Sequence, residues 1–193
     1  MFRCAQHDNS QQLHIEYSMP RKLLNEELGR VSAEEFKQQV KRPVALVLDN
    51  VRSQHNIGAA FRTADAFAVG EVILCGICAA PPNAEIHKSA LGAENTVAWR
   101  YFETTLQAAA QLKREGYELV AVEQAESSVA LSEFKLSDKP CALIFGNEVR
   151  GVAQEVVDEC SRCVEIPQYG TKHSLNVSVS IGVVLWELCR NSD

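Results

Sequence analysis

The sequence predicts an α/β domain built on a mostly parallel β-sheet with helices on both faces. Short runs of aliphatic and β-branched residues recur along the chain, and most are followed by a segment whose apolar residues have helical spacing. Strands that are apolar almost throughout are typical of parallel sheets, because helices cover both faces of such sheets. Polar, glycine-containing loops follow several of these runs, and α/β domains bind ligands in such loops.

The first part of the chain, residues 1–42, is expected to form an N-terminal arm with a helix. Residues 20–39 are predicted to form one polar helix, and Ser32–Glu35 resembles a capping box shifted by one residue. The change to alternating strands and helices comes next, so the main domain is predicted to span residues 43–193.

Six strands and four helices are expected in that domain. The apolar runs that predict strands lie at residues 44–48, 71–77, 97–102, 118–122, 141–145 and 163–166. The segments with helical spacing lie at residues 56–67, 105–115, 152–160 and 174–190.

The composition is that of one soluble globular domain. Of the 193 residues, 46% are hydrophobic and 23% are charged. No apolar run approaches the roughly 20 residues that a membrane helix needs, and the polar N-terminus lacks the apolar stretch of a secretory signal. We therefore expect a cytoplasmic protein with no membrane partner.

The seven cysteines indicate neither a disulfide framework nor a metal site. Their number is odd, and most lie in apolar segments, where a thiol behaves as a small hydrophobe. Two C-x-x-C pairs, Cys75 with Cys78 and Cys160 with Cys163, are separated by about 80 residues, against the 15–20 of a zinc ribbon. We expect no bound metal.

Three polar clusters follow strands and are expected to form one composite site. They are His55–Gly58 together with Arg62, the loop 146–148, and the loop 166–176. The carboxyl ends of parallel strands share one edge of a sheet, so these loops should meet. Gly146 and Gly170 are expected at turns with unusual backbone angles. The fingerprints of dinucleotide and P-loop sites are missing, which argues against the common nucleotide pockets.

The formal net charge of −6 argues against RNA binding through overall charge. The net charge does not exclude a local basic patch, because basic residues flank the polar clusters. These candidates for phosphate contacts are Arg52, Arg62, Lys88, Arg150 and Lys172.

Three segments resemble the motifs of the SpoU (TrmH-like) RNA methyltransferases. They are Asp49–Asp65, Leu143–Val152 and Ile166–Ser180, and they occur in the family's order and spacing. The resemblance covers roughly residues 43–190, which is most of the chain. Any one motif alone would be weak evidence, whereas the three together are specific.

The resemblance implies an enzyme that transfers a methyl group from S-adenosylmethionine to a ribose 2′-hydroxyl in tRNA or rRNA. It also implies a homodimer and a deep trefoil knot in the C-terminal part of the domain, an exception to the rule that chains do not thread. The knot follows from the resemblance alone, since neither composition nor periodicity indicates threading.

The resemblance also assigns roles to individual residues. The implied catalytic residues are Asn56, Arg62, Glu148, Ser174 and Asn176. The implied cofactor-binding residues are Phe145, Gly146, Asn147, Ile166, Gln168, Gly170, Ser174 and Leu175. RNA contacts fall to the five basic residues named above, Arg62 among them.

Arg62 is the family's candidate for activating the 2′-hydroxyl. A guanidinium keeps its proton at neutral pH and is a poor base, so we expect Arg62 to act through electrostatic stabilisation or phosphate binding. Without the motif, Arg62 would be interpreted as an ordinary surface residue of a helix.

The other polar residues also have plain structural interpretations. Asn56 could be only a helix N-cap, and Glu148 only a solvated loop carboxylate. Ser174 and Asn176 could likewise be cap and first-turn residues of the last helix.

Two other functions fit parts of the pattern. One is a catalytically silent RNA-binding module that keeps the cofactor pocket. The other is a generic nucleotide-binding α/β domain with a small-molecule substrate, against which the missing phosphate-loop signatures already argue.

Overall fold

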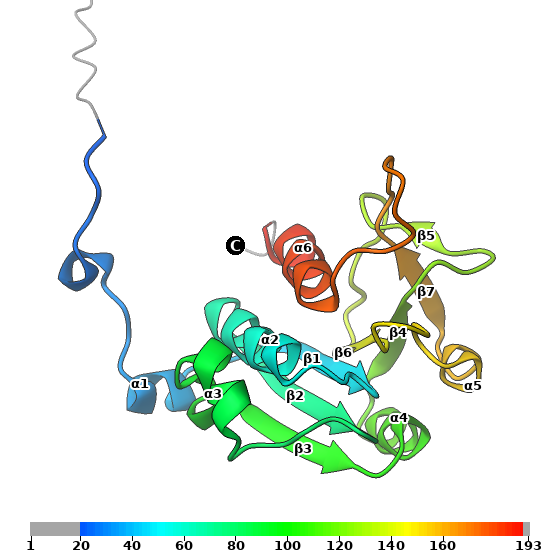
Figure 1. The fold of residues 1–193 in the computed structure, drawn as a ribbon, viewed down its shortest axis with the longest axis horizontal. Coiled ribbons are helices and arrows are strands. Elements are labelled where there is room, and N and C mark those ends of the chain that lie inside the picture. The colour runs from blue at the N-terminus through cyan, green and yellow to red at the C-terminus, as the bar shows by residue number, and fades with distance from the viewer. Residues whose placement is uncertain (1–19, 191–193) are drawn as a thin grey trace, which may run out of the picture. The chain divides into compact units, whose positions relative to one another are not determined.

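The computed structural model describes residues 20–190 (Figure 1). The chain divides into a first unit, residues 1–31, and a second unit, residues 32–193. Part of the expected N-terminal arm, residues 1–19, lies outside the described residues. All strands and the candidate site belong to the second unit.

The single helix expected over residues 20–39 is wrong, because this stretch contains two short helical segments. The first is the 3₁₀ helix η1, Asn25–Leu28, which ends at Gly29 in the left-handed region with φ 59°. The second is α1, Ala33–Gln38, whose N-cap is Ser32. The capping box is confirmed but without the expected shift, since Ser32 Oγ accepts from Glu35 N at 3.2 Å and the Glu35 carboxylate accepts from Ser32 N at 2.8 Å.

The second unit contains one seven-stranded sheet in which every pairing is parallel. The strand order is β3-β2-β1-β6-β4-β7-β5. The strands are β1 Arg42–Asp49, β2 Val69–Cys75, β3 Ala98–Phe102, β4 Glu118–Val122, β5 Val129–Ala130, β6 Cys141–Phe145 and β7 Arg162–Glu165. The predicted parallel sheet is confirmed.

Helices cover both faces of this sheet, as the apolar strands predict (Figure 1). The helices are α2 Gln54–Ala66, α3 Ala84–Ala90, η2 Ala93–Asn95, α4 Thr105–Arg114, α5 Gln154–Val157 and α6 Val177–Cys189. The core on one face takes side chains from α2, α3 and α6, and the core on the other face takes them from α4 and α5.

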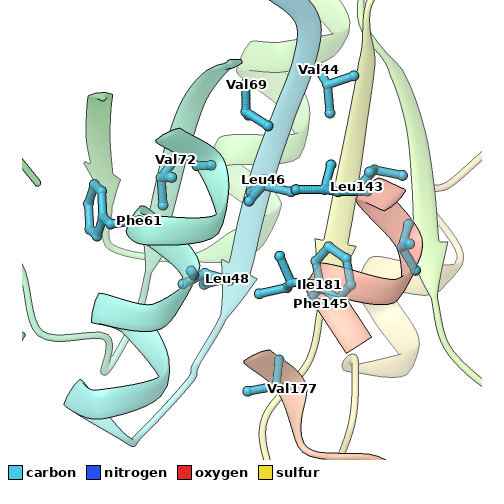
Figure 2. Close-up of a cluster of buried hydrophobic side chains, with 14 of the residues drawn as sticks. Val44, Leu46, Leu48, Phe61, Val69, Val72, Leu143, Phe145, Val177 and Ile181 are labelled. Atoms are coloured by element: carbon cyan, nitrogen blue, oxygen red, sulfur yellow. The ribbon is translucent and has the colours of Figure 1, made fainter. Parts of the chain in front are cut away.

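Strand β1 supplies side chains to both cores because successive residues of a strand point to opposite faces. Leu46 and Leu48 face α2 and α6, whereas Ala45 and Val47 belong to the core under α4. Figure 2 shows Phe145 of β6 and Ile181 of α6 meeting beside Leu48. These side chains are almost fully buried, so α6 is anchored against the centre of the sheet.

Three elements escaped the sequence prediction, and two helices differ in length. The short elements α3, η2 and β5 were missed because seven, three and two residues carry too little periodicity. The helix expected at residues 152–160 is reduced to the single turn of α5. The last helix begins three residues later than expected, at Val177, because Asn176 caps it.

The cysteines of the described residues are free thiols. Burial raises the pKa of Cys75 to about 12 and that of Cys78 to about 11, so both are protonated at neutral pH. Between residues 20 and 190, no three His, Cys, Asp or Glu side chains gather as metal ligands would. In the same part of the chain, no helix has the length and apolar character to cross a membrane.

Helices α2 and α3 approach each other closely at Gly58. A Cβ at this position would lie 2.1 Å from Ser89 Oγ and 2.3 Å from the Ile86 carbonyl oxygen. Ser89 Oγ in turn donates to the His55 carbonyl at 2.9 Å, next to the first turn of α2. The position of the α2 N-terminus therefore depends on the missing side chain at residue 58.

We expect Gly58→Ala to destabilise the domain by about 1–3 kcal/mol, because the added methyl group has no room between the helices. Urea unfolding followed by circular dichroism measures the change. Ala66→Ser, at the exposed end of the same helix, is the control and should stay within about 0.5 kcal/mol of the parent. An unchanged unfolding midpoint for Gly58→Ala would contradict this packing.

Candidate active site

A cavity of about 550 Å³ lies at the carboxyl ends of β4, β6 and β7. Its walls come from the last residues of these strands, from the loops that follow β6 and β7, and from the first turn of α6. The volume falls within the range of small-molecule sites. The strand ends hold the loops, so backbone amides and polar side chains face a common space.

Seven of the eight predicted cofactor-binding residues line this cavity. They are Phe145, Gly146, Asn147, Ile166, Gln168, Ser174 and Leu175. Gly170 does not line it and is exposed in the loop between β7 and α6. Two of the predicted catalytic residues, Glu148 and Asn176, are also in the wall.

Glu148 connects the loop after β6 to the start of α2. Its carboxylate accepts hydrogen bonds from the backbone amides of Arg52 and Ser53, each at 3.0 Å, and from Asn56 Nδ2 at 3.0 Å. Desolvation acts to raise the pKa of Glu148, but these hydrogen bonds outweigh it and hold the pKa below its ordinary value. Glu148 is therefore an anchored carboxylate and not merely a solvated one.

Asn56 joins this carboxylate to the last helix. It is buried, and its Oδ1 accepts from Asn176 Nδ2 at 3.2 Å. Asn56 is not the N-cap of α2, because Ser53 holds that position and its Oγ accepts from Asn56 N. Asn176 is the N-cap of α6, accepting from Ser178 N at 2.8 Å, and so combines capping with the contact to Asn56.

The loop between β6 and α5 is tightly folded around two glycines. Asn147 and Gly151 exchange two backbone hydrogen bonds, at 3.0 and 2.9 Å. A Cβ on Gly146 would lie 2.0 Å from the carbonyl carbon of Gly151, so this position has room only for glycine. Gly151 has φ 68°. The close approach explains Gly146, and the expectation of unusual backbone angles at Gly146 and Gly170 is wrong.

The side chain of Asn147 stabilises the same loop through hydrogen bonds to its backbone. Its Oδ1 accepts from Val149 N at 2.9 Å and Arg150 N at 3.2 Å, and its Nδ2 donates to the Asn50 carbonyl at 2.7 Å. The loop after β6 is thus tied to the loop after β1 at two points, Asn147 and Glu148.

Arg62 lies outside this cavity, about two helical turns from the start of α2. It is exposed, and it forms no hydrogen bond or ion pair with any residue from 20 to 190. Among the predicted RNA-binding residues only Arg150 lines the cavity. Arg52, Lys88 and Lys172 are exposed elsewhere on the second unit, and Lys88 pairs with Glu85 at 2.6 Å.

Ser174 is brought to the cavity but does not cap α6, which leaves its hydroxyl exposed ahead of the helix. The interpretation of Ser174 as a cap residue is therefore wrong, and the cap falls to Asn176 alone.

Glu123 and Gln124 line the cavity and were missed from the sequence. Glu123 Oε2 accepts from Val152 N at 2.9 Å, and Gln124 Nε2 donates to the His173 carbonyl at 2.7 Å. These two residues thereby hold the loop after β6 and the loop after β7. The sequence could have indicated them, because both follow directly on β4, just as the three polar clusters follow their strands.

Comparison with known proteins identifies the family of this chain. The model of the SpoU rRNA Methylase family matches residues 43–186, which include all three loops around the cavity. The chain belongs to this family. The predicted resemblance is confirmed, and so is the α/β fold with a mostly parallel sheet.

Individual SpoU proteins extend this comparison. The tRNA (guanosine(18)-2′-O)-methyltransferase of Aquifex aeolicus is 32% identical over 154 residues, which make up 79% of this chain and 72% of the relative. The 23S rRNA (guanosine-2′-O-)-methyltransferase RlmB of Neisseria meningitidis serogroup B is 36% identical over 148 residues, 77% of this chain and 58% of the relative.

A solved SpoU-like structure, the AdoMet-bound rRNA methyltransferase from Sinorhizobium meliloti, superposes with a TM-score of 0.71 at 28% identity. The match covers 79% of this chain and 58% of that protein. The chain therefore spans less than two thirds of this protein and of the Neisseria relative.

The Glu148 carboxylate makes stability depend on pH in a defined direction. Its pKa is lower in the folded chain than the ordinary 4.5, so its contribution is present above that value and is lost as the pH falls through the folded-state pKa. We expect Glu148→Gln to cost about 1 kcal/mol at pH 7, a figure kept small because the residue is exposed to solvent.

Urea unfolding at pH 7 and at several values below pH 4.5 measures this dependence. The difference between parent and Glu148→Gln should shrink as the pH falls. The exposed Glu133→Gln should show no such trend. A difference that stays constant with pH would contradict the role given to the Glu148 hydrogen bonds.

Proposed function

We propose that this SpoU protein transfers a methyl group from S-adenosylmethionine to a ribose 2′-hydroxyl in RNA. The observation that carries the proposal is the junction of the three motif loops, where Glu148, Asn56 and Asn176 are joined by hydrogen bonds beside the cavity. The relatives are named for this reaction on tRNA and on 23S rRNA, and we assign this chain a tRNA or rRNA substrate.

The cavity residues suit S-adenosylmethionine as the cofactor. The close approach of Gly146 to Gly151 folds the loop after β6 tightly against the cavity, and Phe145, Ile166 and Leu175 provide apolar wall. The related Sinorhizobium protein was solved with AdoMet bound. When bound, the cofactor supplies an activated methyl group. The loops after β6 and β7 would hold it and exclude water.

Arg62 is proposed to stabilise the negative charge that develops on the ribose oxygen, or to hold an adjacent phosphate. Its side chain has no partner among residues 20–190 and is therefore available to a ligand. A guanidinium keeps its proton at neutral pH, which argues against a role as base. Arg52, Arg150 and Lys172 are proposed to contact RNA phosphates, and Lys88 could join them by exchanging its exposed ion pair.

The relatives are named as methyltransferases, and this gives no support to the alternative of a catalytically silent RNA-binding module.

The proposal includes no metal ion. We place the protein in the cytoplasm, where tRNA and rRNA are found. We also keep the division into an arm, residues 1–42, and a catalytic domain, residues 43–193, which agrees with the start of the family match at residue 43.

A deep trefoil knot in the C-terminal part of the domain belongs to the same proposal. Strand β7 lies beyond β4 from β6, yet α6, which follows it, packs back against β6 and α2 (Figure 1). The chain thus returns across the tight loop at residues 146–151, and this return supports the threading.

A homodimer is proposed from the outer face of α6. Val179, Val183 and Trp186 follow one another at helical spacing, and their exposed fractions are 50%, 38% and 63%. The opposite face of the helix is fully buried in the core. An exposed apolar stripe of this kind favours a protein interface, and we assign it to a second copy of the chain.

Methyl transfer is tested by incubating the protein with S-adenosylmethionine labelled in the methyl group and with unmodified tRNA and rRNA. We expect label in dinucleotides that resist alkaline hydrolysis, because a 2′-O-methyl group prevents attack on the neighbouring phosphate. Donor binding without label in either RNA would refute the enzyme and leave the silent module.

In this assay Arg62→Lys should lower kcat at least about tenfold, because a point charge does not replace the planar guanidinium. The Kd of the donor should not change, since Arg62 lies outside the cavity. Arg114→Lys, on the exposed side of α4, is the matched control. Near-normal turnover of Arg62→Lys would remove the specific role of the guanidinium.

Sedimentation tests the homodimer. The parent chain should sediment as a dimer and Trp186→Asp as a folded monomer, because a buried unpaired carboxylate opposes association. Leu106→Asp alters an apolar residue of α4 that is 37% exposed and should leave the dimer intact. A parent chain that is monomeric at working concentration would end this part of the proposal.

A further inference from the structure

Glu123 is a carboxylate in the cavity that none of the three motifs includes. It is the first residue after β4, and β4 lies between β6 and β7 in the sheet. Glu123 therefore stands between the two strands whose loops form most of the cavity wall. This is the edge at which parallel α/β sheets bind nucleotides.

Both oxygens of this carboxylate are fixed by backbone amides. Oε1 accepts from Gln124 N at 2.8 Å, and Oε2 accepts from Val152 N at 2.9 Å. The backbone of Glu123 is itself held, since its amide donates to the Val164 carbonyl at 3.0 Å. A side chain with this much support has one orientation before any ligand arrives.

The carboxylate still has acceptor capacity left. Each carboxylate oxygen can accept two hydrogen bonds, and each oxygen of Glu123 receives one from a residue of the described part of the chain. No cation from residues 20–190 pairs with it. One acceptor site on each oxygen therefore remains for a ligand that carries two neighbouring donors.

Other polar side chains of the cavity either already accept hydrogen bonds from the protein or are not held in one orientation. Asn147 accepts from an amide of its own loop, Glu148 accepts from Asn56 of α2, and Asn176 accepts from Ser178 of α6. Glu165 is a second carboxylate in the wall, but no amide within residues 20–190 fixes its side chain. Glu123 is thus the preorganised acceptor of the cavity.

A ribose with free 2′- and 3′-hydroxyls is the ligand group that matches this acceptor. Its two hydroxyls are adjacent, and each donates one hydrogen bond, which a charged acceptor strengthens. Acidic side chains at strand ends bind ribose hydroxyls in the same way in doubly wound folds.

We infer that Glu123 binds the 2′- and 3′-hydroxyls of the cofactor's ribose and so selects a ribonucleoside in the methyl donor. This inference rests on the proposed function, because it takes the adenosyl donor as the occupant of the cavity. It assigns a role in cofactor specificity to a residue outside the three motifs.

Calorimetric titration of the full chain with S-adenosylhomocysteine and with its 2′-deoxy and 3′-deoxy analogues tests the inference without relying on turnover. Each deoxy analogue should bind the parent chain about tenfold or more weakly, as expected for a lost hydrogen bond to a charged group. In Glu123→Gln, S-adenosylhomocysteine should bind about tenfold more weakly and differ from its analogues by no more than about twofold. Glu126→Gln changes an exposed carboxylate three residues further along the same loop and outside the cavity wall, and it should keep the affinity and the discrimination of the parent.

Equal binding of the three ligands by the parent chain would overturn the role of Glu123, as would full discrimination by Glu123→Gln. Failure of the parent to bind S-adenosylhomocysteine and S-adenosylmethionine at all would instead overturn the proposed function. Glutamine can accept from only one of the two amides. If Glu123→Gln fails to fold, a crystal structure of the parent with S-adenosylhomocysteine decides. Ribose hydroxyls within hydrogen-bond distance of Glu123 support the inference, and hydroxyls directed elsewhere refute it.

Discussion

The Glu148 carboxylate is the contact on which the rest of the site depends. It accepts from two backbone amides at the start of α2 and from Asn56, residues more than 90 positions away in the chain. Free amides at a helix start favour a negative charge, so the carboxylate both satisfies them and fixes the loop after β6. Asn56 extends the connection to Asn176, and the three loops are held as one unit.

The two glycines of the loop after β6 stabilise the same site because they allow neighbouring groups to approach closely. Gly146 lets the backbone of Gly151 approach within a distance that any side chain would prevent. Gly151 in turn leaves room for the Glu123 carboxylate, which a Cβ there would meet at 2.1 Å. The loop after β6 is therefore held in place by Glu123, the residue that follows β4. Because the loop is already ordered, ligand binding loses little backbone entropy.

Helix α6 links the cavity to the surface assigned to a second copy. Its first turn lines the cavity, its inner face packs on Leu46 and Phe145, and its outer face carries the exposed apolar stripe (Figure 2). Asn176 joins these roles, because it caps the helix and contacts Asn56. Association of two chains through α6 would thus restrict the same helix that shapes the site.

The sequence by itself determined the layers of the fold and most of the site. Apolar runs such as Cys141–Phe145 specify buried parallel strands, since the preference is local and repeats from strand to strand. Loops that follow such strands share one edge of the sheet, and this predicts that Glu148 and Asn176 lie near one another. The short helix α3, with seven residues, carried too weak a helical period to be found.

Only the tertiary structure decided which atoms meet. Ser53, not Asn56, caps α2, and this freed Asn56 to bridge Glu148 and Asn176. The bracing role of Glu123 depends on an amide 29 residues away, and Gly146 is required by its distance to Gly151 and not by its own φ. Local preferences act over a few residues, whereas these contacts exist only because strands distant in sequence lie side by side in the sheet.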